Sequence, residues 1–399
     1  MTANGCRGPD IWPSACWRSI VEGSHLTAIP GGLVPEFGLF ADGEITARAS
    51  EMADVAAAAI AAGKPQEEAL KQMADASVDL LIGRTADHMQ QQGPLVAARR
   101  LAGLERLAGI WGAALDSYYT VTVAAIELGA MYSLRCAEAQ VPADRVSSAL
   151  ALLQARTCQT SLEVYALLAA GFPGGAYGRY RTLHELAVTT AVIAEYGRTP
   201  GHPDLADRYL DHTHIEHYQQ ARHFQRSSSH LGWQPFSQET MRTLKRERDR
   251  LIARYGRDYA QPYGWAVGLI RPLTFERLEA KANMDVLRYL YATGSHLVHA
   301  TAHGLRMTLA PGQDGQSAVV IAGPSDDGLC QPAQASLNAL LDVTGGLVLH
   351  GGNPDDPGCM VNFAALGELR NRTLQLFDEA EDRRPTQPAL RSAPREPRL

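Results

Sequence analysis

The chain has 399 residues, of which 45% are apolar and 20% charged, so it can bury a substantial core and is not a disordered protein. Its net charge of −6 gives no sign of the basic surface that long nucleic-acid tracks require, and any nucleic-acid role would need a local basic face. No window offers the roughly 18 uncharged apolar residues of a membrane-spanning helix, and the six scattered cysteines indicate free thiols. We therefore expect a cytoplasmic protein that does not bind a membrane.

The first half of the chain predicts an irregular arm followed by helices. Residues 1–45 contain several prolines and glycines and few large apolar anchors, which is typical of an irregular N-terminal arm. Helical periodicity from 46 to 88, interrupted at "GKP", predicts two helices joined by a turn, and a separate long helix is expected to follow Pro94. The next helix should begin at Pro142, a favoured first helical position, and run until "FPGG". Helices are also expected over 176–197, 203–226 and 237–256, the last of them charged on most of its circumference.

The second half predicts more helices and one small β element. A short helix should precede a long one over about 284–308, and turn-rich "PGQDGQ" between two β-prone runs predicts a β-hairpin over 311–325. Helices are expected around 330–345 and 358–380, before a disordered tail over 383–399. The predicted fold is mainly α, a multi-helix bundle with a small β-hairpin late in the chain. The predicted domains are the arm (1–45), a helical core (46–310), the hairpin (311–325), C-terminal helices (326–382) and the tail (383–399).

Arg181 and Glu185 form a charged pair on the expected helix over 176–197. They stand one helical turn apart, and the other faces of this helix are apolar, which predicts that both charges are buried. A buried charge is costly unless it is paired and hydrogen-bonded. Two interpretations stay open: a structural ion pair that ties helices together, or an arginine that binds an anion or phosphate while the glutamate orients it or handles protons.

The stretch "DHTHIEH" on the expected helix over 203–226 raises the question of a metal site. Asp211 and His214 have the spacing of two ligands on one helix, as in carboxylate-bridged bundles, but such bundles need the motif twice and no E-x-x-H occurs on another core helix. We prefer a core His217 and a solvent-facing His212. Metal binding stays a weak alternative, with the ligand set Asp211, His214, His296 and His299.

The stretch "TGSHLVHATAHG", residues 293–304, places a serine and three histidines on a late helix. Ser295 and His299 can touch across one turn, on a face shared with Tyr291. A serine hydrolase is not indicated, because no orienting acid, oxyanion site or G-x-S-x-G elbow is visible. The alternative is that Gly294 and Ser295 are small so that two helices can approach closely, with His299 bonded to a neighbour.

Several short motifs occur in a characteristic order. They are Tyr255–Gly256, Tyr263–Gly264–Trp265–Ala266 and a Tyr-x3-Ser-x3-His formed by Tyr291, Ser295 and His299, preceded by the Arg-x3-Glu of Arg181 and Glu185 and by the acidic Asp211. In these motifs, residues 145–305 resemble a bacterial family catalogued as domain of unknown function 5677. The resemblance implies a helical domain in which Arg181, Glu185 and His299 meet. It implies no established activity and no cofactor.

Three functions follow from these residues, and whether the chain is an enzyme stays open. The first is a helical module that binds an unknown small ligand or protein partner, with Arg181, Glu185 and His299 as a buried polar network. The second is a metal-independent ribonuclease or other phosphate-directed enzyme, like the HEPN proteins of toxin and phage-defence systems; the nearest motif, Arg288 to His296, departs from their spacing. The third is a metal-dependent helical enzyme. The candidate catalytic residues are Arg181, Glu185, Ser295 and His299, and no cofactor is expected.

Overall fold

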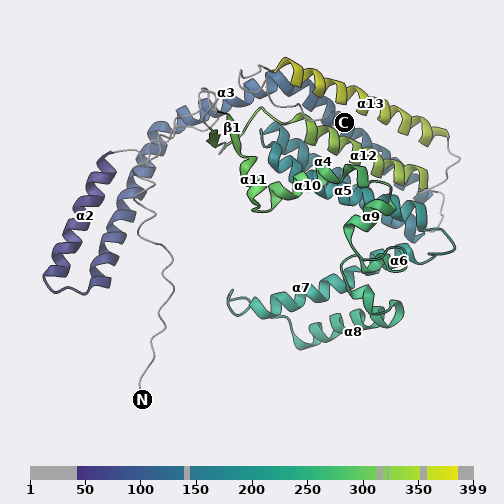
Figure 1. Ribbon diagram of the computed structural model, residues 1–399, viewed down its shortest axis with the longest axis horizontal. Helices are drawn as coiled ribbons and strands as arrows, with labels where there is room; N and C mark the ends of the chain where they lie inside the picture. The colour runs from purple at the N-terminus through teal and green to yellow at the C-terminus, as the bar shows by residue number, and fades with distance from the viewer. Residues whose placement is uncertain (1–42, 139–143, 312–317, 321–322, 351–356, 385–399) are drawn as a thin grey trace. The chain divides into compact units, whose positions relative to one another are not determined.

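The computed structural model describes residues 43–138, 144–311, 318–320, 323–350 and 357–384 (Figure 1). The chain divides into two compact units, Met1–Gly93 and Pro94–Leu399. The expected N-terminal arm lies almost entirely outside the described residues, and so does the expected tail beyond residue 384. The domain boundaries predicted from the sequence stay predictions. All candidate site residues belong to the second unit.

The first unit contains α2 (Gly43–Ala61) and the beginning of α3 (Gln66–Glu138). A turn at residues 62–65 joins them, as "GKP" predicts, and Lys64 Nζ donates a hydrogen bond to Gln72 Oε1 at 2.6 Å across this turn. The expectation of a separate helix after Pro94 is wrong, because α3 continues through Pro94 as one helix of 73 residues. Pro94 is exposed, so water can reach the backbone carbonyl that loses its amide partner there.

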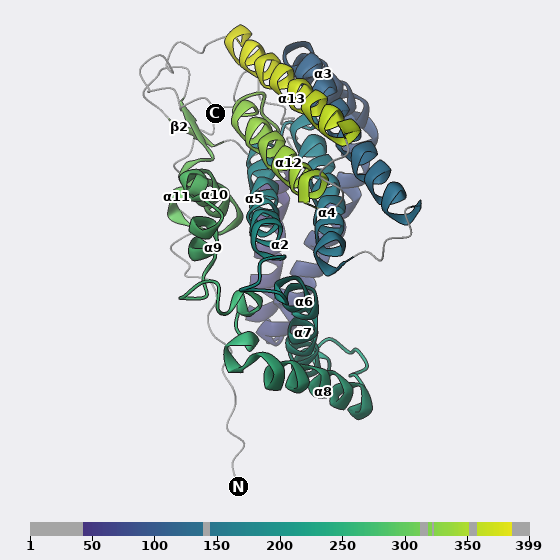
Figure 2. The same cartoon turned by 90° about the vertical axis from the view of Figure 1, so that its right-hand side faces the viewer.

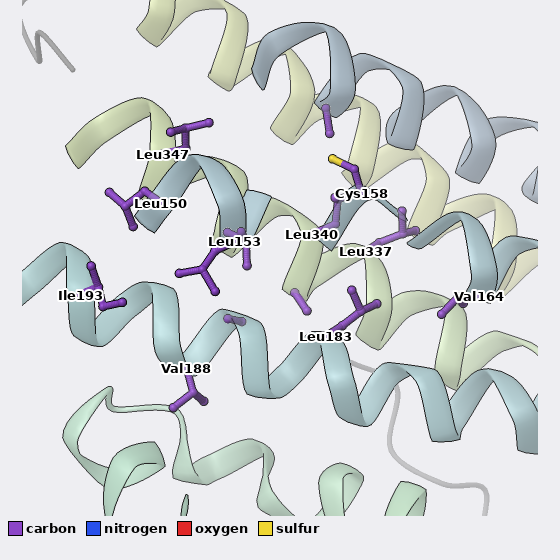
Figure 3. Close-up of a cluster of buried hydrophobic side chains, with 14 of the residues drawn as sticks. Leu150, Leu153, Cys158, Val164, Leu183, Val188, Ile193, Leu337, Leu340 and Leu347 are labelled. Atoms are coloured by element: carbon purple, nitrogen blue, oxygen red, sulfur yellow. The ribbon is translucent and has the colours of Figure 1, made fainter. Parts of the chain in front are cut away.

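The second unit is a helical bundle. It consists of the C-terminal part of α3 with α4 (Arg145–Ala169), α5 (Pro173–Tyr196), α12 (Cys330–His350) and α13 (Pro357–Arg383). Helices α4, α5 and α12 pack against one another, and α13 packs on α12 (Figure 2). Buried side chains from α4, α5 and α12 fill the space between these helices (Figure 3), among them Leu150, Leu153, Leu183, Ile193, Leu337 and Leu340. Each such side chain removed from water contributes about 1.5–3 kcal/mol.

Local chemistry sets several helix ends. Asp144 caps α4 by accepting a hydrogen bond from the Ser147 amide at 2.6 Å, while the expected start at Pro142 lies outside the described residues. Ser237 caps α8 (Gln238–Tyr255) in the same way, through the Thr240 amide at 3.1 Å. Helix α8 ends at Gly256, whose φ of 92° is one that a residue with a side chain rarely adopts.

The expected helix over 203–226 is two helices, α6 (Leu205–Asp211) and α7 (Thr213–Ser227), separated at His212. The expected positions of its histidines are wrong: His212 is buried and His217 is exposed. His212 Nε2 donates to the carbonyl oxygen of Tyr259 at 3.1 Å. The interruption changes the direction in which the following side chains point, so a count of 100° per residue across it fails.

The chain between α8 and α12 is made of short elements. They are η1 (Arg257–Ala260), η2 (Gly264–Ala266), α9 (Phe275–Lys281), η3 (Asp285–Leu287), α10 (Arg288–Val298) and α11 (Ala302–Arg306). The expected long helix over 284–308 is therefore wrong. His299 has extended backbone, with φ −99° and ψ 149°, and Thr301 begins a new helix by accepting a hydrogen bond from the Gly304 amide at 3.0 Å.

The expected β-hairpin over 311–325 is also wrong, and the fold class is corrected to helical. Within the described residues, β1 (Leu309–Pro311) and β2 (Ala318–Val320) pair in antiparallel register, but each has only three residues, and the pair is much shorter than the expected element. Apart from its first residue, Pro311, the "PGQDGQ" signal lies outside the described residues. Paired segments this short add little to a fold, because even a complete isolated hairpin is only marginally stable. Among the described residues, no helix is both long and apolar enough to cross a membrane.

Candidate functional site

Two glycines let α5 and α10 lie in close contact. A Cβ atom at Gly294 of α10 would stand 2.7 Å from the carbonyl oxygen of Tyr177, and one at Gly178 of α5 would stand 2.9 Å from Val298 Cγ2. Neither position has room for a larger side chain, so the expectation that Gly294 allows close helix contact is confirmed. This close contact brings polar residues of α5 next to Tyr291 of α10.

Glu185 and Tyr291 hold the Arg181 side chain in place. Arg181 Nε lies 3.4 Å from Glu185 Oε1, and the Tyr291 hydroxyl donates to the same carboxylate oxygen at 2.9 Å. The guanidinium carbon of Arg181 also lies 5.0 Å from the centre of the Tyr291 ring, within the range of a cation–π contact. The Nε side of the guanidinium therefore faces Glu185 and leaves the Nη atoms for another partner.

That partner is His299, the first residue after α10. Arg181 Nη1 lies 3.4 Å from His299 Nε2, with the arginine as the donor. The structure thus brings Arg181, Glu185 and His299 together in one cluster, although Arg181 and His299 are 118 residues apart in the sequence. The predicted burial of this network is wrong, because the side chains of Arg181 and Glu185 are 27% and 37% exposed and His299 is exposed as well.

Two other predicted residues lie apart from this cluster. Ser295 reaches His299 only through the backbone, its carbonyl accepting from the His299 amide at 3.0 Å, and its hydroxyl forms no hydrogen bond within the described part of the chain. Asp211 pairs instead with Arg145, at 2.8 Å. Arg145 also binds Asp207 at 2.7 Å, so this acidic residue belongs to a surface ion-pair network.

In the part of the chain that the structure describes, the side chains named for the metal and ribonuclease alternatives do not come together in one site. Within the described residues, no three His, Cys, Asp or Glu side chains are arranged to hold a metal ion. His296 Nδ1 lies 3.2 Å from Thr301 Oγ1, and its ring lies 4.8 Å from that of His303. Arg288 pairs with Glu279, not with His296.

A buried polar layer lies beside the cluster, and sequence reasoning missed it. His184 is 1% exposed, and its Nε2 donates to Glu279 Oε1 at 2.8 Å; Glu279 is fully buried and also binds Arg288. Burial lowers the pKa of His184, and the neighbouring Glu279 only partly opposes this effect, so the imidazole is neutral. The available signal was the carboxylate of Glu279 one turn after the buried Phe275, on the apolar face of α9.

The part of the chain that contains the cluster is similar to a known protein family. Residues 147–316 match the model of a family described as a family of unknown function, DUF5677. This part of the chain is therefore similar to that family, and we call it the DUF5677 domain. The resemblance expected over about 145–305 is thereby confirmed, and the match contains Arg181, Glu185 and His299. No curated protein matches the chain, and no solved structure matches it.

Tyr263, the first residue of the Tyr-Gly-Trp motif of the DUF5677 domain, lies near Arg181, Glu185 and Tyr291. Tyr263 has left-handed backbone, with φ 57°, and the following Gly264 is tightly enclosed, since a Cβ there would lie 2.3 Å from the carbonyl oxygen of Tyr259. Burial, with smaller contributions from the nearby Glu185 and Tyr291, raises the pKa of Tyr263 to about 12. Burial likewise raises the pKa of Tyr291. Both phenols therefore keep their protons, and the phenol of Tyr291 donates a hydrogen bond to Glu185.

The electrostatics of the DUF5677 cluster favour a permanent cation at its centre. Burial disfavours the charged form of Arg181, but the contacts with Tyr291 and Glu185 outweigh it, and the pKa of the guanidinium is raised. A fixed arginine with a solvent-reachable edge is the group that proteins use to bind carboxylate and phosphate oxygens through paired hydrogen bonds. The exposed imidazole beside it adds a second nitrogen that can donate to the same anion.

Proposed function

We propose that the DUF5677 domain of this chain is a ligand-binding helical module that holds an oxyanion of its ligand, a phosphate or carboxylate group, between Arg181 and His299. The observation that carries the proposal is the arrangement of the guanidinium. Its Nε side is held by Glu185 and Tyr291, and its Nη1 atom lies 3.4 Å from the exposed His299 Nε2. An anion that enters from solvent can contact both nitrogens without a rearrangement of α5 or α10.

A purely structural role explains these contacts less well. An ion pair as exposed as that of Arg181 and Glu185 contributes only about 0–1 kcal/mol to stability. The enclosed glycines allow the close contact of α5 and α10. The buried His184–Glu279 pair joins α5 to α9, and Glu279 also binds Arg288 of α10. Arg181 and His299 are therefore available for binding.

The residues have distinct roles in this proposal. Arg181 binds two oxygens of the anion through its planar fork. His299 Nε2, which accepts from Arg181 in the free protein, takes up the proton of the other tautomer when the anion binds and donates a third hydrogen bond to it. Glu185 and Tyr291 are positioning residues, because they restrict the guanidinium to one orientation and reduce the entropy that binding costs. Ser295 has no role in the binding step.

Calorimetric titration of the purified chain tests the proposal. Uridine 5′-monophosphate and inorganic pyrophosphate are the phosphate probes, and succinate is the carboxylate probe. Arg181→Ala should weaken binding of the preferred probe roughly 10- to 100-fold, the loss expected for hydrogen bonds to a charged group. Arg181→Lys keeps the charge but not the fork, so its affinity should lie between those of the wild type and Arg181→Ala.

Arg179→Ala is the matched control, because Arg179 lies on the same helix and pairs with Glu163 at 2.6 Å, away from His299. This variant should bind the probe as the wild type does. The proposal fails if no oxyanion probe binds, or if Arg179→Ala and Arg181→Ala lose the same affinity while both remain folded by circular dichroism.

A further inference from the structure

The helical hairpin of α7 and α8 carries a charge opposite to that of the whole chain. Residues 213–257 contain nine arginine and lysine side chains and four carboxylates, a net charge of +5, whereas the chain as a whole carries −6. The two helices lie side by side as an antiparallel pair (Figure 1). This segment is a local basic face of the kind that a protein of negative net charge needs in order to bind a polyanion.

Four arginines form a row along the outer side of α8. Arg242, Arg246, Arg250 and Arg254 follow one another at intervals of four residues, and all four are exposed. Neighbouring like charges at this spacing destabilise a helix. Within the described residues, only Arg250 pairs with a carboxylate, that of Glu247 at 3.0 Å. The positive row is thus poorly neutralised by the protein itself.

The loop between α7 and α8 presents aromatic side chains to solvent. Trp233 is 59% exposed and Phe236 is 42% exposed. Their rings pack on Phe224, with centroids 5.9 Å and 4.9 Å apart, and Gln225 bonds both the amide and the carbonyl of Phe236 at 2.9 Å. These aromatic faces are therefore exposed and held in place, which lowers the entropy cost of stacking a flat ligand on them.

A shallow cleft adjoins the C-terminal end of the arginine row. Its volume is about 510 Å³, and its lining residues are Arg248, Asp249, Ile252, Ala253, Arg257 and Ala260. The one acidic group in this lining, Asp249, is already paired with Lys245 and Arg248. The cleft therefore extends the basic surface of α8 and does not oppose it.

We propose that the α7–α8 hairpin binds single-stranded nucleic acid, with phosphates along the arginine row and a base stacked on Trp233. Exposed aromatic faces beside a positive track are the two components of such surfaces, because phosphates bind the cations and every base has a face that can stack. A membrane-binding helix would expose a stripe of apolar residues along its basic face, but Ala253 is the only apolar residue among the exposed residues of α8, and the exposed Trp233 and Phe236 lie in the loop before it. This inference goes beyond the oxyanion site and does not depend on it.

Fluorescence anisotropy with the full chain and labelled single-stranded oligonucleotides, one of uridine and one of deoxythymidine, tests the inference over a series of salt concentrations. The triple variant R242Q/R246Q/R250Q should weaken binding and reduce the slope of log affinity against log salt by about 2, because each lost phosphate contact contributes about 0.7. Trp233→Ala should weaken binding roughly 5- to 100-fold and leave the slope unchanged. The two oligonucleotides distinguish a ribose from a deoxyribose ligand.

The matched control is R99Q/R100Q/R372Q, which removes the same number of charges from exposed arginines outside the hairpin. This control should retain the wild-type slope and affinity within about twofold. The inference is overturned if neither oligonucleotide binds at low salt, or if the control and the triple variant lose the same slope. It is also overturned if the triple variant loses binding to phosphatidylserine vesicles while oligonucleotide binding is unchanged. All variants change surface residues, and circular dichroism checks their folding.

Discussion

At the scale of single residues, two neighbours on α5 occupy opposite environments. The side chain of Arg181 reaches solvent and the exposed His299, whereas His184 is sealed against the buried carboxylate of Glu279. Burial disfavours the protonated form of His184 and lowers its pKa. The same turn of helix therefore supplies a solvent-reachable cation and a neutral buried imidazole, the first for binding and the second for structure.

The lowered pKa of His184 predicts a dependence of stability on pH. In the unfolded chain a histidine takes up its proton near pH 6.5, but the folded chain takes it up only at lower pH. As the pH falls below about 6.5, the unfolded chain binds more protons and folding becomes less favourable. We expect the midpoint of thermal unfolding to fall more between about pH 7.5 and about pH 5.5 in the wild type than in His184→Gln.

His184→Gln should be less stable than the wild type near neutral pH, because it loses packing and the contact with Glu279. Its curve of midpoint against pH should nevertheless be flatter. Equal slopes for the two proteins, measured by scanning calorimetry in the same buffers, would show that His184 does not take part in the acid transition.

The sequence predicted part of this residue-level arrangement. The order of short motifs implied that Arg181, Glu185 and His299 meet, and periodicity placed Arg181 and Glu185 on one face of a helix. It did not predict the pair of His184 and Glu279, which are 95 residues apart, because periodicity reports only which residues share a face of one helix. The sequence also overestimated the burial of Arg181 and Glu185, because their exposure depends on where α10 ends, and periodicity did not predict that end.

At the scale of elements, helices were predicted well where their ends carry a local signal and poorly where they do not. The Gly-Lys-Pro turn separates α2 from α3, and α8, α12 and α13 lie close to their expected ranges. The interruptions at His212 and His299 were missed because the apolar periodicity continues across them. Their causes are contacts made elsewhere, such as the bond from buried His212 to the Tyr259 carbonyl.

The contact between α5 and α10 should depend on the absence of a side chain at Gly294. In Gly294→Ala the new Cβ would meet the Tyr177 carbonyl oxygen at 2.7 Å, so the helices must separate. We expect this variant to lose about 1–3 kcal/mol of stability in urea unfolding, the usual range for overpacking.

Gly367→Ala on α13 provides the contrast, because no heavy atom lies within 4 Å of a Cβ built at that position. Alanine favours a helix over glycine, so this variant should gain about 0.5–1 kcal/mol. If Gly294→Ala were as stable as Gly367→Ala, the close contact of α5 and α10 would be incorrect.

At the scale of the whole molecule, the second unit is held together by apolar packing and by a few buried polar links. Gln154 of α4 donates to the Ala125 carbonyl of α3 and accepts from the Thr344 hydroxyl of α12, both at 3.1 Å. One amide thus connects three helices and favours a single register for the bundle. The helical composition of this unit was predicted from the sequence. The expected hairpin was not found at its expected length, because turn signals do not determine strand length, and β1 and β2 have only three residues each.

The whole surface offers competing sites to an anion, because arginines are abundant outside the cluster as well as in it. The most direct test is therefore to locate a bound anion by crystallography of the full chain. Crystals would be soaked in selenate, a tetrahedral oxyanion whose heavy atom gives anomalous scattering. We expect an anomalous peak within hydrogen-bond distance of Arg181 Nη1 and His299 Nε2, and no peak there in crystals of Arg181→Ala. An unoccupied cluster in wild-type crystals that bind selenate elsewhere would contradict the proposal that Arg181 and His299 bind an oxyanion.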